Sequence, residues 1–376
     1  MSFLNRRVKY LDNLRVFLTC LVICHHQVIA FGAPGGWYYV AAAPTDVVSF
    51  VLLTMFVAVN QAFFMSLFFF VAAFFTPQSL DKKGVRRFIK DRLMRLGIPL
   101  IVYFFLLNPS VVYLARLFKG QIEPGYFRFM ATRLLTCVSP GPMWFVLALL
   151  MFTAVYVAVF ARRQRRGASS FRMPFPGNRR ILIFIVGIGF FTFLLRLVCP
   201  LGTEILNLQI AYFPLYIAMF VFGIFAYRSS WLEEIRARQT ALWFRMALVL
   251  IISLPLILVL GGALKGAGDT FRGGLHWQAY VYAAWEPFVC VGISLKLAAL
   301  FRARLNITNK ITQHAAKSSY TAYIIHPFFV VVGTYLAKAW PLPSLAIVLL
   351  LCPLVVVACF LSADLIRQLP LLNKIL

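Results

Sequence analysis

The chain contains about ten segments of mostly apolar residues, each long enough to cross a lipid bilayer as a helix. A helix needs about 17 to 25 such residues to cross a hydrocarbon core of about 30 Å. The segments cover approximately residues 11–31, 47–75, 97–115, 143–161, 181–199, 209–227, 244–262, 277–297, 319–337 and 344–363. Because 62% of the residues are hydrophobic and only 13% are charged, a soluble core could not bury this apolar surface. The sequence therefore predicts an all-α polytopic membrane protein.

The Lys and Arg residues lie mainly between these segments and favour alternate loops. If the N-terminus is inside, 28 of the 37 basic residues fall on the same side as the two termini, and seven fall on the opposite side. Basic residues near the ends of spans stay in the cytoplasm, so both termini are expected to be cytoplasmic. A net charge of +26 would suggest nucleic-acid binding in a soluble protein. Its distribution over alternate loops argues against nucleic acid and leaves membrane lipids as the expected partners.

The first apolar segment carries polar residues that are costly inside a bilayer, namely Asp12, Arg15, His25 and His26. Such residues are by default candidates for a functional site, and they also make a cleavable signal peptide improbable. At about 100° per residue, Arg15 and His26 share one face of a helix and lie about 16 Å apart along it. His25 is rotated by about 100° from His26 and is expected to bond a neighbouring helix.

The cysteines and histidines predict no metal site. Cys24, His25 and His26 are consecutive, and consecutive helical residues point too far apart to bind one ion. Cys137 and Cys199 are expected near the outer face, where a disulfide between them stays an open alternative. No soluble domain is recognisable, so residues 1–376 are predicted to form one integral-membrane domain, and the sequence does not indicate an oligomeric state.

Arg15 and His26, with ten residues between them at the start of a chain with about ten spans, resemble the opening motif of the membrane acyltransferase 3 family. Further segments follow in the family's order over essentially the whole chain: NQAFFMSLFFF at 60–70, DRLMRLGIP at 91–99, MWF at 143–145 and SSYTAYIIHP at 318–327. The stand-alone branch labelled glucan biosynthesis protein C-like is the most similar. The resemblance implies transfer of an acyl group, commonly acetyl, from cytoplasmic acyl-coenzyme A to a hydroxyl of a carbohydrate or glycolipid acceptor. It also implies a bacterial inner (plasma) membrane and a role in O-acetylation of polysaccharide.

The resemblance gives the first candidate roles to His26 and Arg15. Acyl transfer to a hydroxyl needs a base for the hydroxyl proton and donors for the oxyanion. His26 is predicted to be that base or a transient nucleophile, and Arg15 is predicted to position the donor or its thioester. Glu286 is expected near mid-bilayer in the eighth span, where a carboxylate needs a cation or a shifted pKa. It is a candidate to orient His26, and an ion pair that only fixes helix packing is its alternative.

Four residues are predicted to bind the donor. Arg92 and Arg95 are three residues apart, hence on one helical face, and arginine grips the phosphates of a coenzyme well. Their alternative role is contact with anionic lipid head groups. Tyr323 and His326 are expected in the ninth span as donor-site or structural residues. His326 would lie only seven residues from the cytoplasmic end of that span.

Three residues are predicted to bind the acceptor. Asn60 and Gln61, in the long second span, offer donors for an oxyanion or a sugar hydroxyl, and interhelical hydrogen bonds are their alternative. Trp144 begins the fourth span at the outer interface, where a tryptophan stacks on a sugar or anchors the helix. No metal cofactor is expected beside the acyl-coenzyme A co-substrate.

Two other classes of protein are alternatives to an enzyme. A secondary transporter or flippase for a polar or glycan-linked substrate also fits about ten spans with polar residues at mid-membrane. It usually shows two related halves with matching interrupted helices, which this sequence lacks. A haem protein with two axial histidines is disfavoured because His26 is expected in the outer third of the membrane and His326 in the inner third.

Overall fold

The computed structural model describes residues 8–41, 46–122, 125–165, 172–370, 372 and 375, without the side chains of 161–165 and 264. Of these described residues, 81% are helical. The only strands in these residues are β1 (Glu204–Ile205) and β2 (Leu208–Gln209), which pair antiparallel. The all-α membrane fold predicted from the sequence is confirmed. Arg6, Arg7 and Lys374, three of the basic residues counted for the expected cytoplasmic termini, lie outside the described residues.

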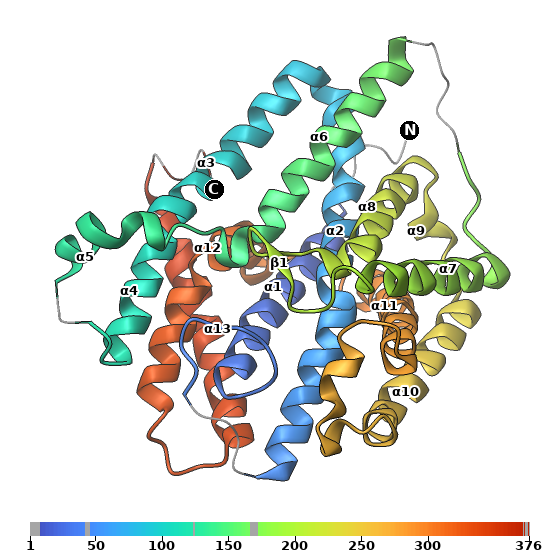
Figure 1. Cartoon of the computed structure of the whole chain (residues 1–376). Helices are drawn as coiled ribbons and strands as arrows, with labels where there is room; N and C mark the ends of the chain where they lie inside the picture. The colour runs from blue at the N-terminus through green and yellow to red at the C-terminus, as the bar shows by residue number, and fades with distance from the viewer. Residues whose placement is uncertain are drawn as a thin grey trace. The chain divides into compact units, whose positions relative to one another are not determined.

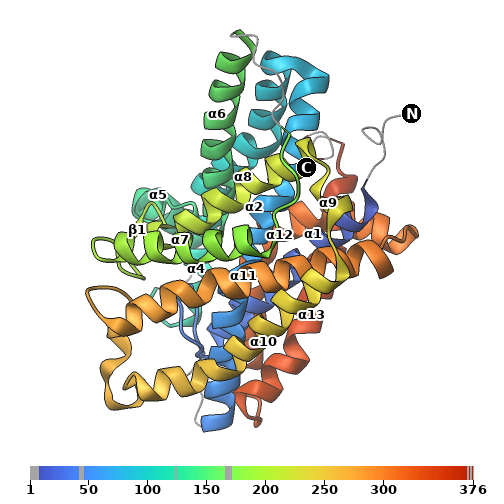
Figure 2. The ribbon, with the colours of Figure 1, turned by 90° about the vertical axis from the view of Figure 1, so that its right-hand side faces the viewer.

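The helices follow one another along the chain as shown in Figures 1 and 2. The α-helices are α1 (Lys9–Ala30), α2 (Val47–Arg92), α3 (Ile98–Val102), α4 (Asn108–Phe118), α5 (Tyr126–Arg133), α6 (Trp144–Arg165), α7 (Asn178–Arg196), α8 (Phe213–Arg228), α9 (Trp231–Glu234), α10 (Ala237–Leu260), α11 (Trp277–Arg304), α12 (Lys310–Ala337) and α13 (Ser344–Gln368). Two π-helical turns are η2 (Leu93–Gly97) and η3 (Tyr103–Leu107). The 3-10 turns are η4 (Leu134–Thr136), η5 (Gly141–Met143), η6 (Ile210–Tyr212), η7 (Ala263–Lys265) and η8 (Ala267–Phe271).

Nine helical segments of the described chain are long and apolar enough to cross a membrane. They overlap all ten predicted spans, because the 72-residue segment Val47–Phe118 includes both the second and the third. Residues 82–95, which lie between the second and third predicted spans, do not form a loop. These residues are helical apart from Gly84, whose φ of 70° breaks the regular backbone. Lys and Arg are good helix formers, so a basic run does not by itself end a helix.

Two prolines explain the π-helical turns within this segment. Pro99 follows η2 and Pro109 follows η3. A proline lacks the backbone N–H that an α-helix donates to the carbonyl four residues earlier, so the preceding turn is free to widen. Single π-turns inside α-helices occur frequently at functional sites. The first of them, η2, contains Arg95 and follows directly on Arg92.

The chain divides into two compact units that are interleaved along the sequence. Unit 1 contains residues 1–14, 61–89 and 148–307, and unit 2 contains residues 15–60, 90–147 and 308–376. Because each unit draws on separated parts of the chain, the division does not give two consecutive domains. The single domain predicted for residues 1–376 stays a prediction.

Unit 2 has a core made by four helices. Buried apolar residues of α1, the beginning of α2, α12 and α13 form one cluster, which includes Ile23, Leu53, Val330 and Cys352. The helices α12 and α13 lie side by side (Figure 1). This packing holds α1 against α12 and so fixes where their polar side chains meet.

Unit 1 packs α7, α10 and α11 around a second cluster, which includes Ile185, Trp243 and Val291. The helices α10 and α11 are neighbours in both views (Figures 1 and 2). A Cβ atom at Gly292 of α11 would lie 2.5 Å from the Trp243 carbonyl oxygen and from the Ala247 side chain of α10. The absence of a side chain at Gly292 therefore allows the two helices to approach closely.

Candidate functional site

Two histidines meet in unit 2, His326 fully buried and His26 partly buried. Nδ1 of His26 on α1 lies 3.0 Å from Nε2 of His326 on α12, and the two rings are nearly parallel, with centroids 5.0 Å apart. His326 has no exposed surface. The structure thus joins two residues that are 300 positions apart in the sequence.

The expectation that His26 and His326 lie at different depths was wrong. Helix α12 begins at Lys310, because the Asn309 side chain accepts from the Thr312 N–H at 2.8 Å and the Thr312 hydroxyl accepts from the Asn309 N–H at 3.0 Å. This reciprocal cap starts the helix nine residues before the expected span. His326 is therefore 16 residues from the start of its helix, and His26 is 17 residues from the start of α1 at Lys9, about 24 and 26 Å along the two axes.

The hydrogen bonds of the pair fix which nitrogen carries each proton. Nδ1 of His326 lies 2.5 Å from the carbonyl oxygen of Tyr323. A carbonyl can only accept, so this Nδ1 must carry the hydrogen, and Nε2 of a neutral His326 must be an acceptor. His26 then donates from Nδ1 to His326. The lone pair of His26 is consequently on Nε2, the nitrogen that can take a proton or attack a carbonyl carbon.

Trp37 covers this histidine pair. It lies in the segment after α1, and its ring stacks on His26 with centroids 4.1 Å apart and 17° between the planes. The Nε1 atom of Trp37 is buried, and within the described chain it has no hydrogen-bond partner. An indole N–H can only donate, and a buried donor without an acceptor is costly. Trp37 therefore offers an unused donor directly beside His26.

A tyrosine and asparagine network continues from Trp37. The hydroxyl of Tyr38 donates to Oδ1 of Asn108 and lies 3.2 Å from the Tyr103 hydroxyl. Nδ2 of Asn108 donates to the Cys137 carbonyl at 2.7 Å. Gly141 has a φ of 44°, and a Cβ atom there would collide with the Tyr38 hydroxyl and Oδ1 of Asn108. Only glycine leaves room for this network.

The segment that begins α6 adjoins the same site. The Tyr323 hydroxyl donates to the carbonyl of Pro142, and its ring contacts Phe145 edge to face. Tyr323, predicted at the donor site, is thus tied to η5 while its carbonyl holds His326. Trp144, predicted to bind the acceptor, is the first residue of α6, two positions after Pro142. No ligand tests either role.

Arg15 occupies the predicted face of α1. It is half-buried, and its carbonyl oxygen accepts from the Thr19 hydroxyl at 3.0 Å. Because α1 is unbroken from Lys9 to Ala30, the eleven steps from Arg15 to His26 place both on one side of the helix, as the sequence indicated. Arg92 and Arg95 stand where α2 passes into η2, so the widened turn alters the simple three-residue spacing assumed for them.

Asn60 and His25 bond to each other. Nδ2 of Asn60 lies 3.2 Å from Nδ1 of His25, and both residues are buried. This is the contact to a neighbouring helix expected of His25. For Asn60 the same contact is an interhelical hydrogen bond, the role given above as the alternative to acceptor binding. Oδ1 of Asn60 has no hydrogen-bond partner in the part of the chain that the structure describes.

Glu286 lies in unit 1, where it forms a buried ion pair with Arg196. Nη2 of Arg196 is 2.6 Å from Oε2 of Glu286, and the exposed fractions of the side chains are 0% and 4%. The guanidinium also lies over the rings of Tyr212 and Tyr282, with its central carbon 5.3 and 5.8 Å from the centroids. The orienting partner of His26 within unit 2 is His326, and the role predicted for Glu286 stays a prediction.

Gln61 belongs to the surroundings of Glu286. Its Nε2 donates to the Tyr216 hydroxyl at 3.1 Å, and it lines a cavity of about 10 Å³ together with Ser66 and Glu286. Oε1 of Glu286 and Oγ of Ser66 are buried and have no hydrogen-bond partner among the described residues. A polar cavity of this size accommodates about one water molecule, which could satisfy both atoms.

The described residues contain neither a disulfide between the two cysteines considered above nor a group of metal ligands. Cys137 and Cys199 are both free thiols. No group of three or more His, Cys, Asp or Glu side chains in these residues is arranged to hold a metal ion. Because His26 and His326 lie at the same depth, depth no longer argues against haem. Metal–imidazole bonds are about 2 Å long, so two axial histidines would hold their nitrogens about 4 Å apart. Nδ1 of His26 and Nε2 of His326 are instead in direct hydrogen-bond contact.

Sequence reasoning missed Trp37, Tyr38, Tyr103 and Asn108. Trp37 and Tyr38 lie in an irregular segment, to which no helical periodicity applies. Asn108 and Tyr103 are polar residues of a predicted span, and Asn108 is only 2% exposed. The cost of burying an unpaired amide inside a span was the signal that could have identified Asn108.

Comparison with known proteins gives one family. A family model described as an acyltransferase domain, acyltransferase 3, matches residues 8–364. The chain is 25% identical over 243 residues to a protein named glucans biosynthesis protein C from Salmonella schwarzengrund, and 24% identical over 243 residues to the protein of that name from Salmonella typhi. Each match covers 62% of this chain and 61% of the relative's length. No solved structure matches the chain.

Proposed function

Because the chain belongs to the acyltransferase 3 family, we propose that it is an integral-membrane O-acyltransferase. It transfers an acyl group, acetyl in the simplest case, from acyl-coenzyme A to a hydroxyl of a carbohydrate-type acceptor. The observation that carries the proposal is the chain of hydrogen bonds from the Tyr323 carbonyl through His326 to His26. This series of hydrogen bonds leaves the lone pair of His26 on Nε2, where it can act as a base.

The reaction then proceeds by ordinary acyl-transfer chemistry. Nε2 of His26 takes the proton of the acceptor hydroxyl, and the hydroxyl oxygen attacks the thioester carbonyl. A carbon–oxygen bond forms, the carbon–sulfur bond breaks, and the thiolate of coenzyme A receives the proton. If His26 is instead acylated first, Nε2 bonds the acyl carbon as the carbon–sulfur bond breaks and releases the thiolate; the acceptor oxygen then bonds that carbon, the carbon–nitrogen bond breaks, and the hydroxyl proton passes to the thiolate. His326 acts as a positioning residue in both routes.

Trp37 is the proposed donor to the oxyanion. A negative charge develops on the thioester oxygen in the transition state, and a fixed N–H aimed at it lowers the barrier. The buried Nε1 of Trp37 beside His26 meets this need without giving up another hydrogen bond. Stacking on His26 holds the indole in place.

The donor is proposed to bind through Arg92, Arg95 and Arg15. Coenzyme A carries several phosphate charges, which guanidinium groups bind well. Arg92 and Arg95 stand at the π-turn η2, a type of turn that often marks a functional site. Arg15 is on the same face of α1 as His26, about three turns away, and so suits the part of the donor between its phosphates and its thioester.

The acceptor is proposed to be a glucan or a related glycan. The support is the name of the relatives, glucans biosynthesis protein C, of whose length this chain covers 61%. Trp144 is proposed to stack on the sugar. The distribution of basic residues supports placing both termini in the cytoplasm, and the bacterial source of the relatives supports an inner membrane.

A coupled assay tests this function. Purified protein is incubated with acetyl-coenzyme A and a linear glucan, and free thiol and acetylated glucan are both measured. Equal amounts of the two products are expected. Arg92→Gln/Arg95→Gln should raise the KM for acetyl-coenzyme A at least tenfold, whereas Lys82→Gln/Lys83→Gln, which removes two basic residues earlier in α2, should change it less than about twofold.

Two results would contradict this function. A folded wild type that releases no thiol with any acyl donor or glycan contradicts an acyltransferase and favours the transporter alternative. Equal KM values for the two double variants contradict the assignment of the donor site to Arg92 and Arg95.

A further inference from the structure

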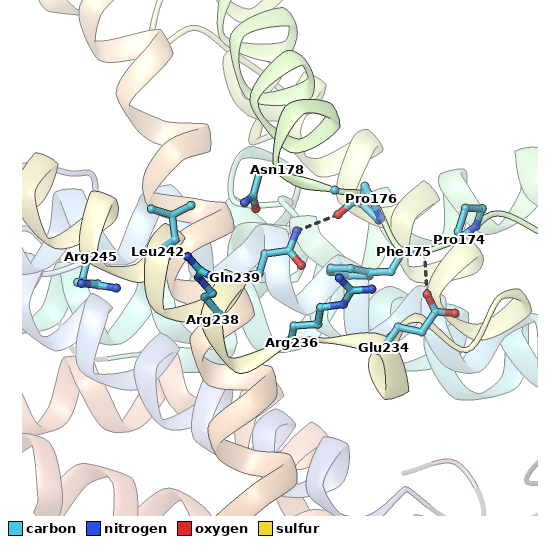
Figure 3. A pocket seen from close by; sticks show the side chains of 11 residues that line it. Pro174, Phe175, Pro176, Asn178, Glu234, Arg236, Arg238, Gln239, Leu242 and Arg245 are labelled. Atoms are coloured by element: carbon cyan, nitrogen blue, oxygen red, sulfur yellow. Dashed lines mark hydrogen bonds between the residues drawn. The ribbon is translucent and has the colours of Figure 1, made fainter.

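A second site lies in unit 1, where α10 begins. A hollow of about 620 Å³ is lined by the residues 174–178 and by the first three turns of α10 with the residues before it (Figure 3). This volume is in the range of small-molecule sites in proteins. Nothing in the proposed acyl transfer uses it.

Hydrogen bonds hold the residues around this hollow in place. The Phe175 N–H donates to Oε2 of Glu234 at 2.9 Å, and Nε2 of Gln239 donates to the Pro176 carbonyl at 2.9 Å, as Figure 3 shows. Nε1 of Trp231 donates to the carbonyl of Met173 at 2.7 Å. The hollow is therefore a feature built by the fold and not a gap beside a loose segment.

The lining of the hollow is strongly basic. Arg236, Arg238 and Arg245 contribute to it, and within the described chain none of the three has an ion-pair partner. The one acidic lining residue, Glu234, already accepts the Phe175 N–H. Helix α10 begins beside the hollow without a side-chain cap, so its first N–H groups add positive potential. The chemistry indicates a phosphate-bearing anion.

The same face of α10 continues as an apolar stripe. Steps of three and four residues from Arg238 lead through Leu242 and Arg245 to Val249, Ile252 and Leu256, all within about 40° of one line on the helix. The exposed fractions of Val249, Ile252 and Leu256 are 66%, 76% and 60%. The stripe runs for about 16 Å beyond Arg245, a length that suits an acyl chain.

We propose that this hollow binds the head group of an acidic phospholipid, with its phosphate on Arg236, Arg238 and Arg245 and its acyl chains along the stripe of α10. A soluble phosphate compound would use the hollow but not the stripe, so the continuity of the two favours a lipid. The distribution of basic residues assigns this end of α10 to the cytoplasmic leaflet. The site is independent of the acyl-transfer proposal.

Lipid binding to the purified full chain in detergent tests the proposal. Radiolabelled phosphatidylglycerol and phosphatidylcholine are titrated in mixed micelles at about 1 M salt, where the screening length of about 3 Å suppresses general attraction between surface charges. Wild type is expected to bind phosphatidylglycerol at least tenfold more tightly than phosphatidylcholine. Arg238→Gln/Arg245→Gln should remove this preference. Arg179→Gln/Arg180→Gln, which removes two charges at the start of α7 outside the hollow, should keep it within about twofold.

Two outcomes overturn the proposal. If both double variants lose the preference equally while remaining folded by thermal melting, the lipid responds to general charge and not to the hollow. If glycerol 3-phosphate, which has the phosphate without acyl chains, displaces phosphatidylglycerol as well as unlabelled phosphatidylglycerol does, the hollow binds a soluble anion instead. Both readouts are binding measurements, so they are independent of acyl transfer.

Discussion

Replacing His326 by Phe is expected to slow acyl transfer with little effect on substrate binding. Phe fills a similar volume and preserves a flat ring beside Trp37, but it cannot accept the hydrogen bond from Nδ1 of His26. The tautomer of His26 with its lone pair on Nε2 then loses the hydrogen bond that its Nδ1–H donates to residue 326. His26 would shift toward the other tautomer, in which Nε2 carries the hydrogen and is no base.

The size of this effect follows from the lost hydrogen bond. A buried donor left without an acceptor costs about 1 to 3 kcal/mol. At about 1.4 kcal/mol per tenfold change, kcat should fall by about 5- to 150-fold. The KM values for acetyl-coenzyme A and acceptor should stay within about threefold, because His326 touches neither substrate in this account.

His326→Gln is the matched control. A glutamine amide can accept from His26 with its oxygen and donate to the Tyr323 carbonyl with its nitrogen, so it can replace both hydrogen bonds. It should retain at least several times the kcat of His326→Phe. Steady-state kinetics on both folded variants gives the answer. The reasoning is refuted if His326→Phe has the kcat of wild type, or if His326→Gln is no faster than His326→Phe.

Three further changes have defined outcomes. Trp37→Phe keeps the stacking but removes the N–H, so kcat should fall about 100-fold at unchanged melting temperature, and an unchanged kcat would refute the oxyanion role. Arg196→Met leaves Glu286 buried and uncompensated and should lower the stability to unfolding by about 3 to 5 kcal/mol, whereas Arg196→Met/Glu286→Leu should be more stable than the single variant in melting experiments. At the start of α2, the Asp46 carboxylate accepts the Ser49 N–H at 2.7 Å, and this bond lowers the pKa of Asp46. The stabilisation from this hydrogen bond is therefore present above about pH 4 and is lost as the pH falls through the lowered pKa. The melting temperature of Asp46→Ala should be below that of wild type at pH 7 and equal to it in strong acid.

The helical content and the polar face of α1 could be predicted because both follow from local rules. Long apolar runs must form helices in a bilayer, where unpaired backbone groups are too costly. Once α1 is a helix, the positions of Arg15 and His26 on one face follow from its regular geometry. No contact with another part of the chain enters either argument.

The pairing of His26 with His326 could not be predicted in the same way. It depends on where α12 begins, and that is set by the cap between Asn309 and Thr312, outside the apolar run. It also depends on the packing of α1 against α12, which no periodicity in either helix encodes. Recognising the sequence Asn309 to Thr312 as a cap would have corrected the depth of His326 but not named its partner.

The continuous segment from α2 to α4 shows a different limit. The basic residues of 82–95 lie between two predicted spans, where charge often ends a helix, yet a helix can leave the bilayer and continue in water. The π-turns were hidden for another reason. Pro99 and Pro109 permit a kink, a break or a widened turn, and the sequence alone does not select among these.

The most direct test of the central claim compares the same substitution at two adjacent histidines. His26→Gln and His25→Gln are purified and given isotopically labelled acetyl-coenzyme A with glucan, and labelled glucan is measured. His26→Gln is expected to lose at least 100-fold in rate, because the base is gone. His25→Gln should stay within about tenfold of wild type, since His25 bonds Asn60 and is turned about 100° away along the helix. A His26→Gln protein that acetylates glucan at the wild-type rate would contradict the account.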